Sequence, residues 1–459
     1  MKKIGYNLYI VRKYILPFGV IILVIGLGGL FYLITPRVVD ITPADGASNV
    51  SGSAAIRIRF SRLMDADSVL ARLNLQPIQT GKVSWEGNTL IFTPQKPWQN
   101  GTQVTVRLDK GARAKNFPQL GLLQAHQWSF RIGSPKILYL YPSDGPARLY
   151  MLDPLSGNPK AISQELGDVV DFSVSPNGAM LVLAVRDENG SAIYSKVGVE
   201  GEPTLLRSYQ NSQIISPTFS PSLDYLAFVR TDFSLAQPET HIYILNLKEN
   251  PAPEPMRVPD SGGTVQYPSW SANDILAYYD GGEKVYRFYD ARMKKELTTV
   301  TCQTGEKGTW SADSQSFVFA EILMPNDSSV PTSHLLRFVL NQHKLEDISQ
   351  ASYTEDASPQ FSPDGQSIVF GRKYLDALQW TPGRQIWIME VATLNTHPLL
   401  QEGQFNHYDF TWSPDGEQIA YMRFNQVDPT APAEIWLINR DGSQNRVLVH
   451  GGYNPQWIP

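Results

Sequence analysis

Two copies of a short element combine a hydroxyl, a carboxylate and a glycine at fixed spacing: FSPDGQSIVF at residues 361–370 and WSPDGEQIAY at residues 412–421. A serine beside an aspartate suggests a cation site or an acid–base pair, since both chemistries use carboxylate oxygens. A repeated ion site would need its carboxylate in most copies, but the weaker copies read SPNG at 175–178, SPSL at 220–223, SAND at 271–274 and SADS at 311–314. Turn-forming residues persist while the charge does not. The element is therefore predicted to be a hairpin turn.

Other residues with catalytic or metal-binding chemistry are scattered. The sequence contains no Gly-x-Ser-x-Gly, His-Glu-x-x-His or Asp-x-Asp-x-Asp-Gly element, so common hydrolase, zinc-protease and calcium signatures are missing. Its seven histidines lack metal-ligand spacing, and we predict no metal and no cofactor. The single cysteine, Cys302, lies in the strand-like run LTTVTCQ. A buried structural thiol is favoured there over a nucleophile, because no histidine is near it in sequence.

Composition and charge narrow the class of protein. The net charge is -5, and basic residues do not cluster beyond the N-terminus. This argues against nucleic-acid binding, which needs a basic stripe to meet phosphates. Charged residues make up 18% of the chain, while Gly, Pro, Tyr and Trp are plentiful. That balance is typical of an all-β, turn-rich protein.

The N-terminal segment is predicted to anchor the chain in a membrane. Ile15 to Ile34 form an uncharged run, which as a helix would span roughly 30 Å, the hydrocarbon thickness of a bilayer. Basic residues precede it, at Lys2, Lys3, Arg12 and Lys13. The positive-inside rule then predicts a cytoplasmic tail at 1–13, a transmembrane anchor at 14–35 and extracytoplasmic domains after it. A cleavable signal peptide is the alternative, but large residues occupy the place where small ones are needed for cleavage.

Residues 36–133 show the pattern of a small β-sandwich. Period-2 alternation appears at 55–60, 89–94, 102–108 and 126–132, separated by Gly, Pro and Asn turns, as in Ig-like domains. The segment resembles the bacterial Ig-like domain of the S-layer SbsA type, through PADGASNV at 43–50, IRFSRLMD at 58–65, FTP at 92–94 and WSF at 128–130. The resemblance implies a surface-exposed spacer or adhesive module rather than chemistry.

Residues 135–459 contain a repeat built around the Ser-Pro-Asp-Gly element. Its lead residues are spaced by 40 to 51 positions, at Val174, Phe219, Trp270, Trp310, Phe361, Trp412 and Trp457. This interval fits one four-stranded propeller blade. The segment begins without a first strand and ends with one, so the strand at 455–459 is expected to complete the first blade and leave no long edge exposed. The repeat predicts seven blades, with six or eight as alternatives.

The SPDG-x-x-I-A-F and I-W-x-M signatures of this repeat resemble the TolB-type, WD40-like (PD40) propellers. The resemblance covers about 325 residues and is strongest in the last two repeats. It implies a periplasmic or surface propeller that binds proteins or peptides. Together with the anchor, it predicts a single-pass protein of the bacterial cell membrane.

Four loops between the second and third strands are unusually long, at 231–240, 322–333, 373–384 and 424–433. All four should lie on the same face, and loops on a rigid scaffold often carry function. Aromatic, apolar and arginine side chains on them are candidate binding residues of the kinds found at interface hot spots: Phe233, Met324, Tyr374, Trp380, Arg384 and Phe424. Neutral loop drift, or packing of the loops on each other or on the Ig-like domain, is the alternative explanation.

We therefore expect an all-β protein with an N-terminal transmembrane helix, an Ig-like stalk and a propeller. Its expected function is non-enzymatic binding of an envelope or surface protein, a peptide or a glycan, with no nucleic acid involved. The alternative is an envelope hydrolase or lyase whose polar residues converge at the propeller channel.

Overall fold

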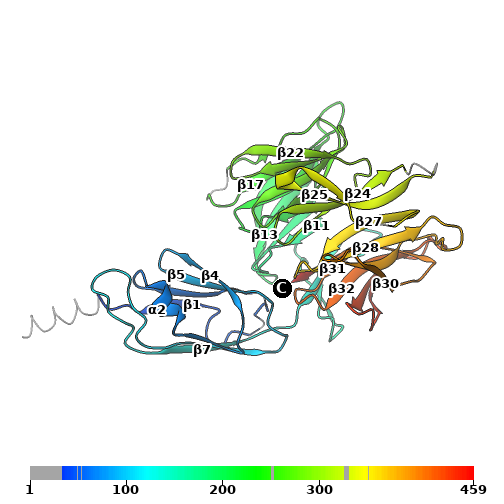
Figure 1. Cartoon of the computed structure of the whole chain (residues 1–459). Coiled ribbons are helices and arrows are strands. Elements are labelled where there is room, and N and C mark those ends of the chain that lie inside the picture. The colour runs from blue at the N-terminus through cyan, green and yellow to red at the C-terminus, as the bar shows by residue number, and fades with distance from the viewer. Residues whose placement is uncertain are drawn as a thin grey trace, which may run out of the picture. The chain divides into compact units, whose positions relative to one another are not determined.

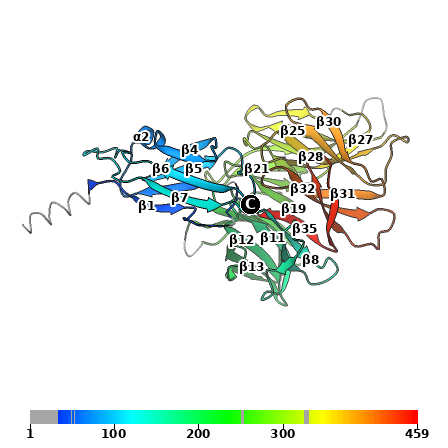
Figure 2. The ribbon, with the colours of Figure 1, turned by 90° about the horizontal axis from the view of Figure 1, so that it is seen from below.

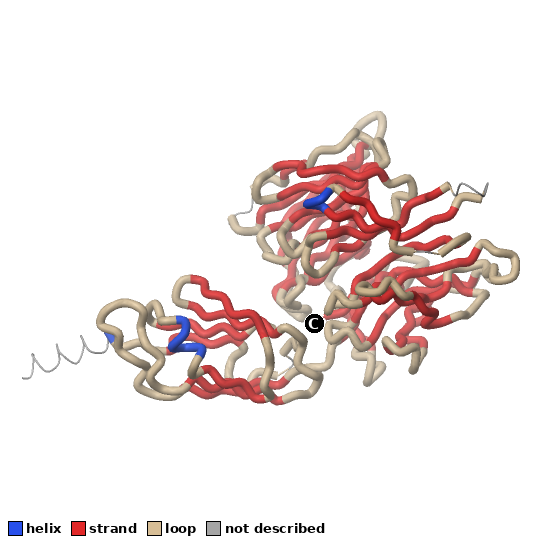
Figure 3. The backbone as a smooth tube through the Cα atoms, in the orientation of Figure 1, coloured by secondary structure: helices blue, strands red, loops and turns tan. Residues whose placement is uncertain are grey.

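A computed structural model describes residues 34–48, 50–52, 54–249, 253–324, 330–349 and 351–458. They divide into two compact units, the first ending at Gly133 and the second beginning at Ser134. Both units are built mainly from β-strands, with little helix among the described residues (Figures 1 and 3).

The predicted cytoplasmic tail lies outside the described residues, and so does the predicted anchor except for its last two residues. Within the described part of the chain, none of the helices has the length and apolar character needed to cross a membrane.

The first unit is a sandwich of two sheets. One sheet has the order β1-β2-β5-β4 and the other β3-β6-β7. Their bounds are β1 Val38–Thr42, β2 Ile56–Phe60, β3 Leu73–Gln76, β4 Gly81–Glu86, β5 Thr89–Pro94, β6 Gln103–Leu108 and β7 His126–Arg131. The four predicted strands are confirmed as β2, β5, β6 and β7, whereas β1, β3 and β4 were not predicted.

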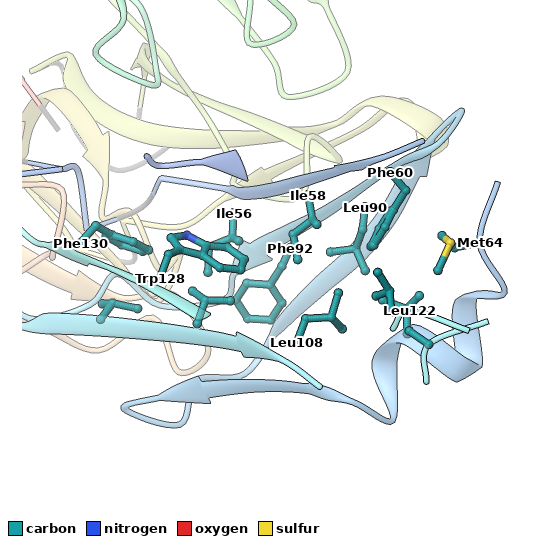
Figure 4. Packing of buried hydrophobic residues seen from close by; sticks show 14 of the residues in the cluster. Ile56, Ile58, Phe60, Met64, Leu90, Phe92, Leu108, Leu122, Trp128 and Phe130 are labelled. Atoms are coloured by element: carbon teal, nitrogen blue, oxygen red, sulfur yellow. The ribbon is translucent and has the colours of Figure 1, made fainter. Parts of the chain in front are cut away.

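The core of this unit lies between the two sheets (Figure 4). In β2, Ile56, Ile58 and Phe60 are buried while the arginines between them are exposed, because successive side chains of a strand point to opposite faces. Trp128 and Phe130 of β7 enter the same core from the facing sheet. The alternation in the sequence thus marks the inner face correctly.

A short helix, α2 (Ala66–Leu70), interrupts this unit, although the sequence predicted no helix here. Asp65 caps its N-terminus: the Asp65 carboxylate accepts a hydrogen bond from the Ser68 backbone N–H at 2.8 Å. An aspartate in this position satisfies one of the free N–H groups at a helix start. The Met-Asp end of the Ig-like motif therefore acts as a helix cap.

The second unit consists, in its described residues, of five four-stranded antiparallel sheets and one eight-stranded sheet. The eight-stranded sheet contains two antiparallel groups, β23–β26 and β27–β30, which are joined by one parallel pair, Ser333 with Glu355. The strands that precede it are β8 Lys136–Tyr141, β9 Arg148–Leu152, β10 Pro159–Ala161, β11 Asp168–Val174, β12 Met180–Arg186, β13 Gly190–Val197, β14 Thr204–Gln210, β15 Ser212–Phe219, β16 Tyr225–Asp232, β17 Glu239–Asn246, β18 Met256–Arg257, β19 Val265–Trp270, β20 Ile275–Asp280, β21 Val285–Asp290 and β22 Lys295–Thr301. From there on they are β23 Thr309–Trp310, β24 Ser316–Leu323, β25 Thr332–Val339, β26 Lys344–Asp347 after the short 3-10 helix η1 (Leu340–Gln342), β27 Thr354–Phe361, β28 Ser367–Tyr374, β29 Gln385–Glu390, β30 Thr396–Leu400, β31 Phe405–Trp412, β32 Gln418–Asn425, β33 Glu434–Asn439, β34 Arg446–His450 and β35 Tyr453–Ile458.

The C-terminal strand closes the second unit, as predicted. β35 pairs antiparallel with β8 (Figure 2), so the first sheet has the order β10-β9-β8-β35. The observed strand begins two residues earlier than the predicted closing strand at 455–459. Gln456 then donates from its side-chain amide to the Phe172 carbonyl in β11 at 2.9 Å, which ties the last strand to the next sheet.

Four of the seven lead residues are tryptophans, and each of these links its first strand to the first strand of the preceding repeat. The indole N–H of Trp412 donates to the Gln360 carbonyl, and that of Trp457 donates to the Thr411 carbonyl, both at 3.1 Å. Trp270 and Trp310 make the same contact with Thr218 and Ser269. The spacing of lead residues therefore reflects a contact between adjacent sheets as well as a repeat length.

The Ser-Pro-Asp-Gly elements are confirmed as hairpin turns between first and second strands. Residues 362–366 join β27 to β28, and residues 413–417 join β31 to β32. Gly365 and Gly416 have φ values of +69° and +73°, which glycine adopts without steric cost. The Asp364 carboxylate accepts hydrogen bonds from the Ser362 hydroxyl at 2.5 Å and the Gln366 N–H at 3.0 Å. Asp364 thus stabilises the turn in which it lies.

Candidate binding site

The four long loops occupy the same place in the strand order of their sheets. They join β16 to β17, β24 to β25, β28 to β29 and β32 to β33. Among their described residues, large exposed hydrophobic side chains lie on or beside all four: Phe233, Leu235, Ile322, Met324, Val330, Leu378, Trp380 and Val427. Packing does not require such residues to face water, so they are candidates for contact with a ligand.

A pocket of about 380 Å³ opens beside the loop between β28 and β29. This volume falls in the range of about 300–1,000 Å³ that is usual for small-ligand sites. Residues of β28, β29, their connecting loop and the crossover from β30 to β31 line it: Arg372, Tyr374, Gln379, Thr381, Gln385, Trp387, Gln401 and Gly403.

Arg372 and Asp356 fix the inner wall of the pocket. The Arg372 guanidinium forms two hydrogen bonds with the Asp356 carboxylate, at 2.7 and 2.6 Å, and both residues are buried. Burial would lower the pKa of this arginine, yet the hydrogen bonds with Asp356 raise it overall. The guanidinium carbon lies 5.1 Å from the centre of the Trp387 ring. The ion pair therefore orients an aromatic side chain as well as closing the wall.

Gln385 of β29, the cross-strand neighbour of Arg372, joins this wall to the loops. Its amide nitrogen donates to the Gly383 and Phe405 carbonyls at 2.9 and 3.1 Å, and its amide oxygen accepts from the Glu402 N–H at 2.5 Å. These bonds hold the long loop and the crossover together. The pocket is thus bounded by backbone whose position is set before any ligand binds.

The structure places three of the predicted site residues on the loop beside this pocket. Tyr374 lines the pocket and contacts Trp387 edge-on, with ring centres 5.9 Å apart. Trp380 lies between two lining residues and is 55% exposed, with the Lys373 ammonium 5.1 Å from its ring centre. Arg384 does not line the pocket: its guanidinium pairs with Glu306 at 3.1 Å and Glu355 at 2.6 Å.

The other three predicted residues lie on other loops. Phe424 packs edge-on against Tyr408, with ring centres 5.6 Å apart. Phe233 and Met324 are 49% and 63% exposed. These residues belong to the predicted face but not to the lining of the pocket.

Sequence reasoning missed the arginines that lie near the end of several second strands. Arg230, Arg372 and Arg423 each follow a lead aromatic by eleven residues, which is a signal that the repeat contains. Each guanidinium lies over aromatic rings, and that of Arg423 is 3.8 Å from the Phe405 centre and 3.6 Å from the Trp436 centre. Such stacking is attractive because the ring face carries negative charge.

Polar residues also lie on the innermost strands. Asp171 of β11 accepts hydrogen bonds from the Ser216 N–H at 2.7 Å and the Asn454 amide at 2.8 Å. Burial raises the pKa of this carboxyl, while the hydrogen bonds oppose the rise. Lys307, in the segment before β23, lies 3.9 Å from Asp409 of β31. The two hydrogen bonds of Asp171 link β11 to β15 and to β35, which belong to other sheets. Its carboxylate therefore mainly connects neighbouring sheets.

Cys302 is buried, and its thiol lies 3.4 Å from the Thr304 hydroxyl. Burial raises the pKa of this thiol, which disfavours the nucleophilic thiolate. The expected structural role is supported. Among the described residues, no group of three or more His, Cys, Asp or Glu side chains is arranged to hold a metal ion.

Comparison with known proteins assigns the first unit and supports the fold of the second. Residues 34–132 match the bacterial Ig-like domain family. A puromycin-hydrolysing peptidase of Mycobacterium tuberculosis aligns with 88% of this chain and 57% of its own, at 10% identity and a TM-score of 0.51. TolB of Acinetobacter baumannii aligns with 84% of this chain and 83% of its own, at 13% identity and a TM-score of 0.43. The predicted resemblances to Ig-like and propeller proteins are confirmed.

One curated relative matches in sequence over a limited stretch. A probable dipeptidyl peptidase 4 of Emericella nidulans is 28% identical over 97 residues, which is 21% of this chain and 12% of the relative. The match therefore spans a small part of that protein. The neighbours include TolB as well as peptidases, and the likeness is one of fold.

Proposed function

We propose that this chain is a non-enzymatic binding module of the bacterial envelope. In this proposal residues 14–35 anchor it in the membrane, the Ig-like unit serves as a stalk, and the second unit is a seven-bladed propeller outside the cytoplasm. The count treats the eight-stranded sheet as two blades. The long-loop face, defined by the loops at 231–240, 322–333, 373–384 and 424–433, would hold the ligand.

The pocket beside the β28–β29 loop carries this proposal. It combines a fixed wall, unused amide groups and aromatic side chains, next to the exposed Trp380 and Leu378. Ligand sites commonly join an apolar lining with a few positioned polar groups. A hydrolase or lyase at the propeller axis is the second candidate, but Asp171 on the innermost strands is already occupied by hydrogen bonds between sheets.

Site-specific photo-crosslinking tests the proposed face. A photoreactive residue at position 380 of the full chain, in a bacterial envelope, should form a crosslink to a defined ligand. A second experiment places the photoreactive residue at position 233. Replacement of residues 375–382 by Gly and Ser should abolish the crosslink formed from that position. Val197 is a matched control, because it is 81% exposed and lies at the turn between β13 and β14, at the other end of its sheet. Equal capture from Val197 and Trp380 would contradict the proposal.

A further inference from the structure

The lining of the pocket carries no free charge. Arg372 is the one charged side chain among the lining residues, and Asp356 neutralises it through a buried, doubly hydrogen-bonded pair. The neighbouring Lys373 lies over Trp380, and Asp376 accepts the Leu378 N–H at 2.7 Å. A ligand carboxylate, phosphate or ammonium would lose its water here without gaining an opposite charge, which is costly. The lining thus favours an uncharged ligand.

The polar groups that remain available are those that suit hydroxyls. Gln379 and Gln401 line the pocket with exposed side chains, and a primary amide both donates and accepts hydrogen bonds. The Thr381 hydroxyl donates to the Gly383 carbonyl at 2.7 Å and keeps its lone pairs for a ligand donor. A ligand hydroxyl also donates and accepts, so a polyhydroxylated ligand can satisfy all three groups at once.

Aromatic rings supply the apolar part of the site. Tyr374 and Trp387 meet edge-on within the lining, and the exposed Trp380 lies between the lining residues Gln379 and Thr381 in the sequence. The C–H groups of a sugar ring form an apolar face with slight positive charge, which matches the negative face of an aromatic ring. Saccharides present such an apolar face together with a dense set of hydroxyls.

The geometry argues against an extended peptide. Peptides commonly bind by adding a strand to an exposed sheet edge, and here the edge strand of the group is β30. The pocket is bounded by the loop after Tyr374 and the crossover at Gln401 and Gly403. These segments are outside the β strands, so the pocket lacks the row of backbone groups that strand addition needs.

We propose that this pocket binds an uncharged saccharide unit of an envelope or surface glycan. The inference rests on the proposed function, since it names the ligand of the same face. Gln379 and Gln401 would hydrogen-bond the hydroxyls, Trp380 would stack on the ring, and the Arg372–Asp356 pair would hold Trp387 in place.

Binding of the purified full chain, in detergent, to an array of neutral oligosaccharides, acidic oligosaccharides and peptides tests this inference. We expect neutral oligosaccharides to bind with little dependence on salt, because the ligand is uncharged and the charged residue of the lining, Arg372, is paired with Asp356. Gln401→Ala and Trp380→Ala should each weaken that binding by about tenfold, the loss of one hydrogen bond or stacking contact. Gln404→Ala is the matched control, since Gln404 lies in the same crossover and outside the lining.

The outcomes separate this inference from the proposed function. Peptide binding that falls in Gln401→Ala would overturn the saccharide inference and keep the binding face. Acidic glycans that bind more weakly as salt rises would overturn the neutral character of the ligand. If neutral oligosaccharides fail to bind while Trp380 still crosslinks a partner, the inference fails alone. If both fail, the proposed function fails with it.

Discussion

Serine, rather than aspartate, is the constant residue of the repeated turn. In all six copies the serine hydroxyl accepts a backbone N–H from the start of the second strand, at 2.8 to 3.1 Å. Five of the six serines are also buried: Ser175, Ser220, Ser271, Ser362 and Ser413. A buried hydroxyl that closes a turn cannot be replaced by an apolar group without leaving that N–H unpaired. This explains why serine persists while Asp gives way to Asn or Ser.

Ser314 stands where the best-formed copies have glycine, and its replacement should stabilise the protein. Its φ is +60°, and its buried hydroxyl has no hydrogen-bond partner. A left-handed conformation costs a non-glycine residue about 1 kcal/mol, and an unpaired buried hydroxyl adds to the cost. Ser314→Gly should therefore raise the free energy of unfolding by about 1 kcal/mol in urea titrations.

Gly365→Ser is the reciprocal control for this prediction. Gly365 has φ +69°, and a Cβ there would lie 3.1 Å from the Ala312 side chain. We expect a loss of about 1 kcal/mol. A stabilising effect of Gly365→Ser, or a destabilising effect of Ser314→Gly, would refute the argument from backbone strain.

At the scale of elements, the charged cluster between β31, β32 and β33 should make stability depend on pH. The Glu402 carboxylate lies 3.7 Å from His407 and contacts the Arg423 guanidinium. Interaction with His407, and then with Arg423, lowers the pKa of Glu402 despite partial burial. A carboxyl with a lowered folded-state pKa stabilises the protein above its unfolded pKa of about 4.3. That contribution is lost as the pH falls through the folded-state value.

Glu402→Gln should therefore destabilise the protein at neutral pH by roughly 1 kcal/mol. The difference from the unaltered protein should shrink as the pH falls below about 4.3, because protonation removes the same charge. Urea unfolding between pH 7 and pH 3.5 measures this difference. Glu417→Gln, an exposed position on the adjoining turn, is the control and should show no such trend. If the difference in the free energy of unfolding between Glu402→Gln and the unaltered protein stays constant across this pH range, the lowered pKa of Glu402 is contradicted.

The elements were predictable to different degrees, for physical reasons. β2 has one buried face and alternates in the sequence, whereas β28 is buried on both faces over most of its length and runs apolar, and both were found. β3 and β4 carry few buried side chains, so little hydrophobic pattern marks them. The long loops and the residues Tyr374 and Trp380 could be placed on one face, because the hairpin turns fixed the strand order.

The pocket itself could not be predicted from the sequence. Its walls depend on Gln385, which joins a loop to the crossover at Glu402, and on Arg372, which pairs with Asp356 of another strand. Sequence spacing does not specify such side-chain partners. For the same reason, Arg384 was expected to face a ligand although it pairs with Glu306 and Glu355.

At the scale of the whole molecule, closure of the ring depends on β35. Removal of residues 453–459 should expose the edge of β8 and the apolar surface under Trp457. Unpaired edges promote pairing with other chains. We therefore expect the truncated protein to lose cooperative unfolding of the second unit and to form aggregates in size-exclusion chromatography. A peptide covering residues 452–459, added during refolding, should restore monomer in part.

Trp457→Phe is a milder form of the same experiment. It keeps an aromatic ring but loses the indole N–H bond to the Thr411 carbonyl. A loss of about 1 kcal/mol in the free energy of unfolding is expected. A truncated protein that remains monomeric with an unchanged melting temperature would show that β35 is dispensable for closure.

The pairing of β35 with β8 also sets the order of events during synthesis. Gln456 and its register partner in β8, Leu138, are 318 residues apart, and ribosomes add roughly 5–20 residues per second. The sheet of β8, β9 and β10 must therefore wait about 15–60 s with an open edge before its last strand exists. During that interval the nascent chain is vulnerable to wrong partners, and a folding factor that shields strand edges would act on it at this stage.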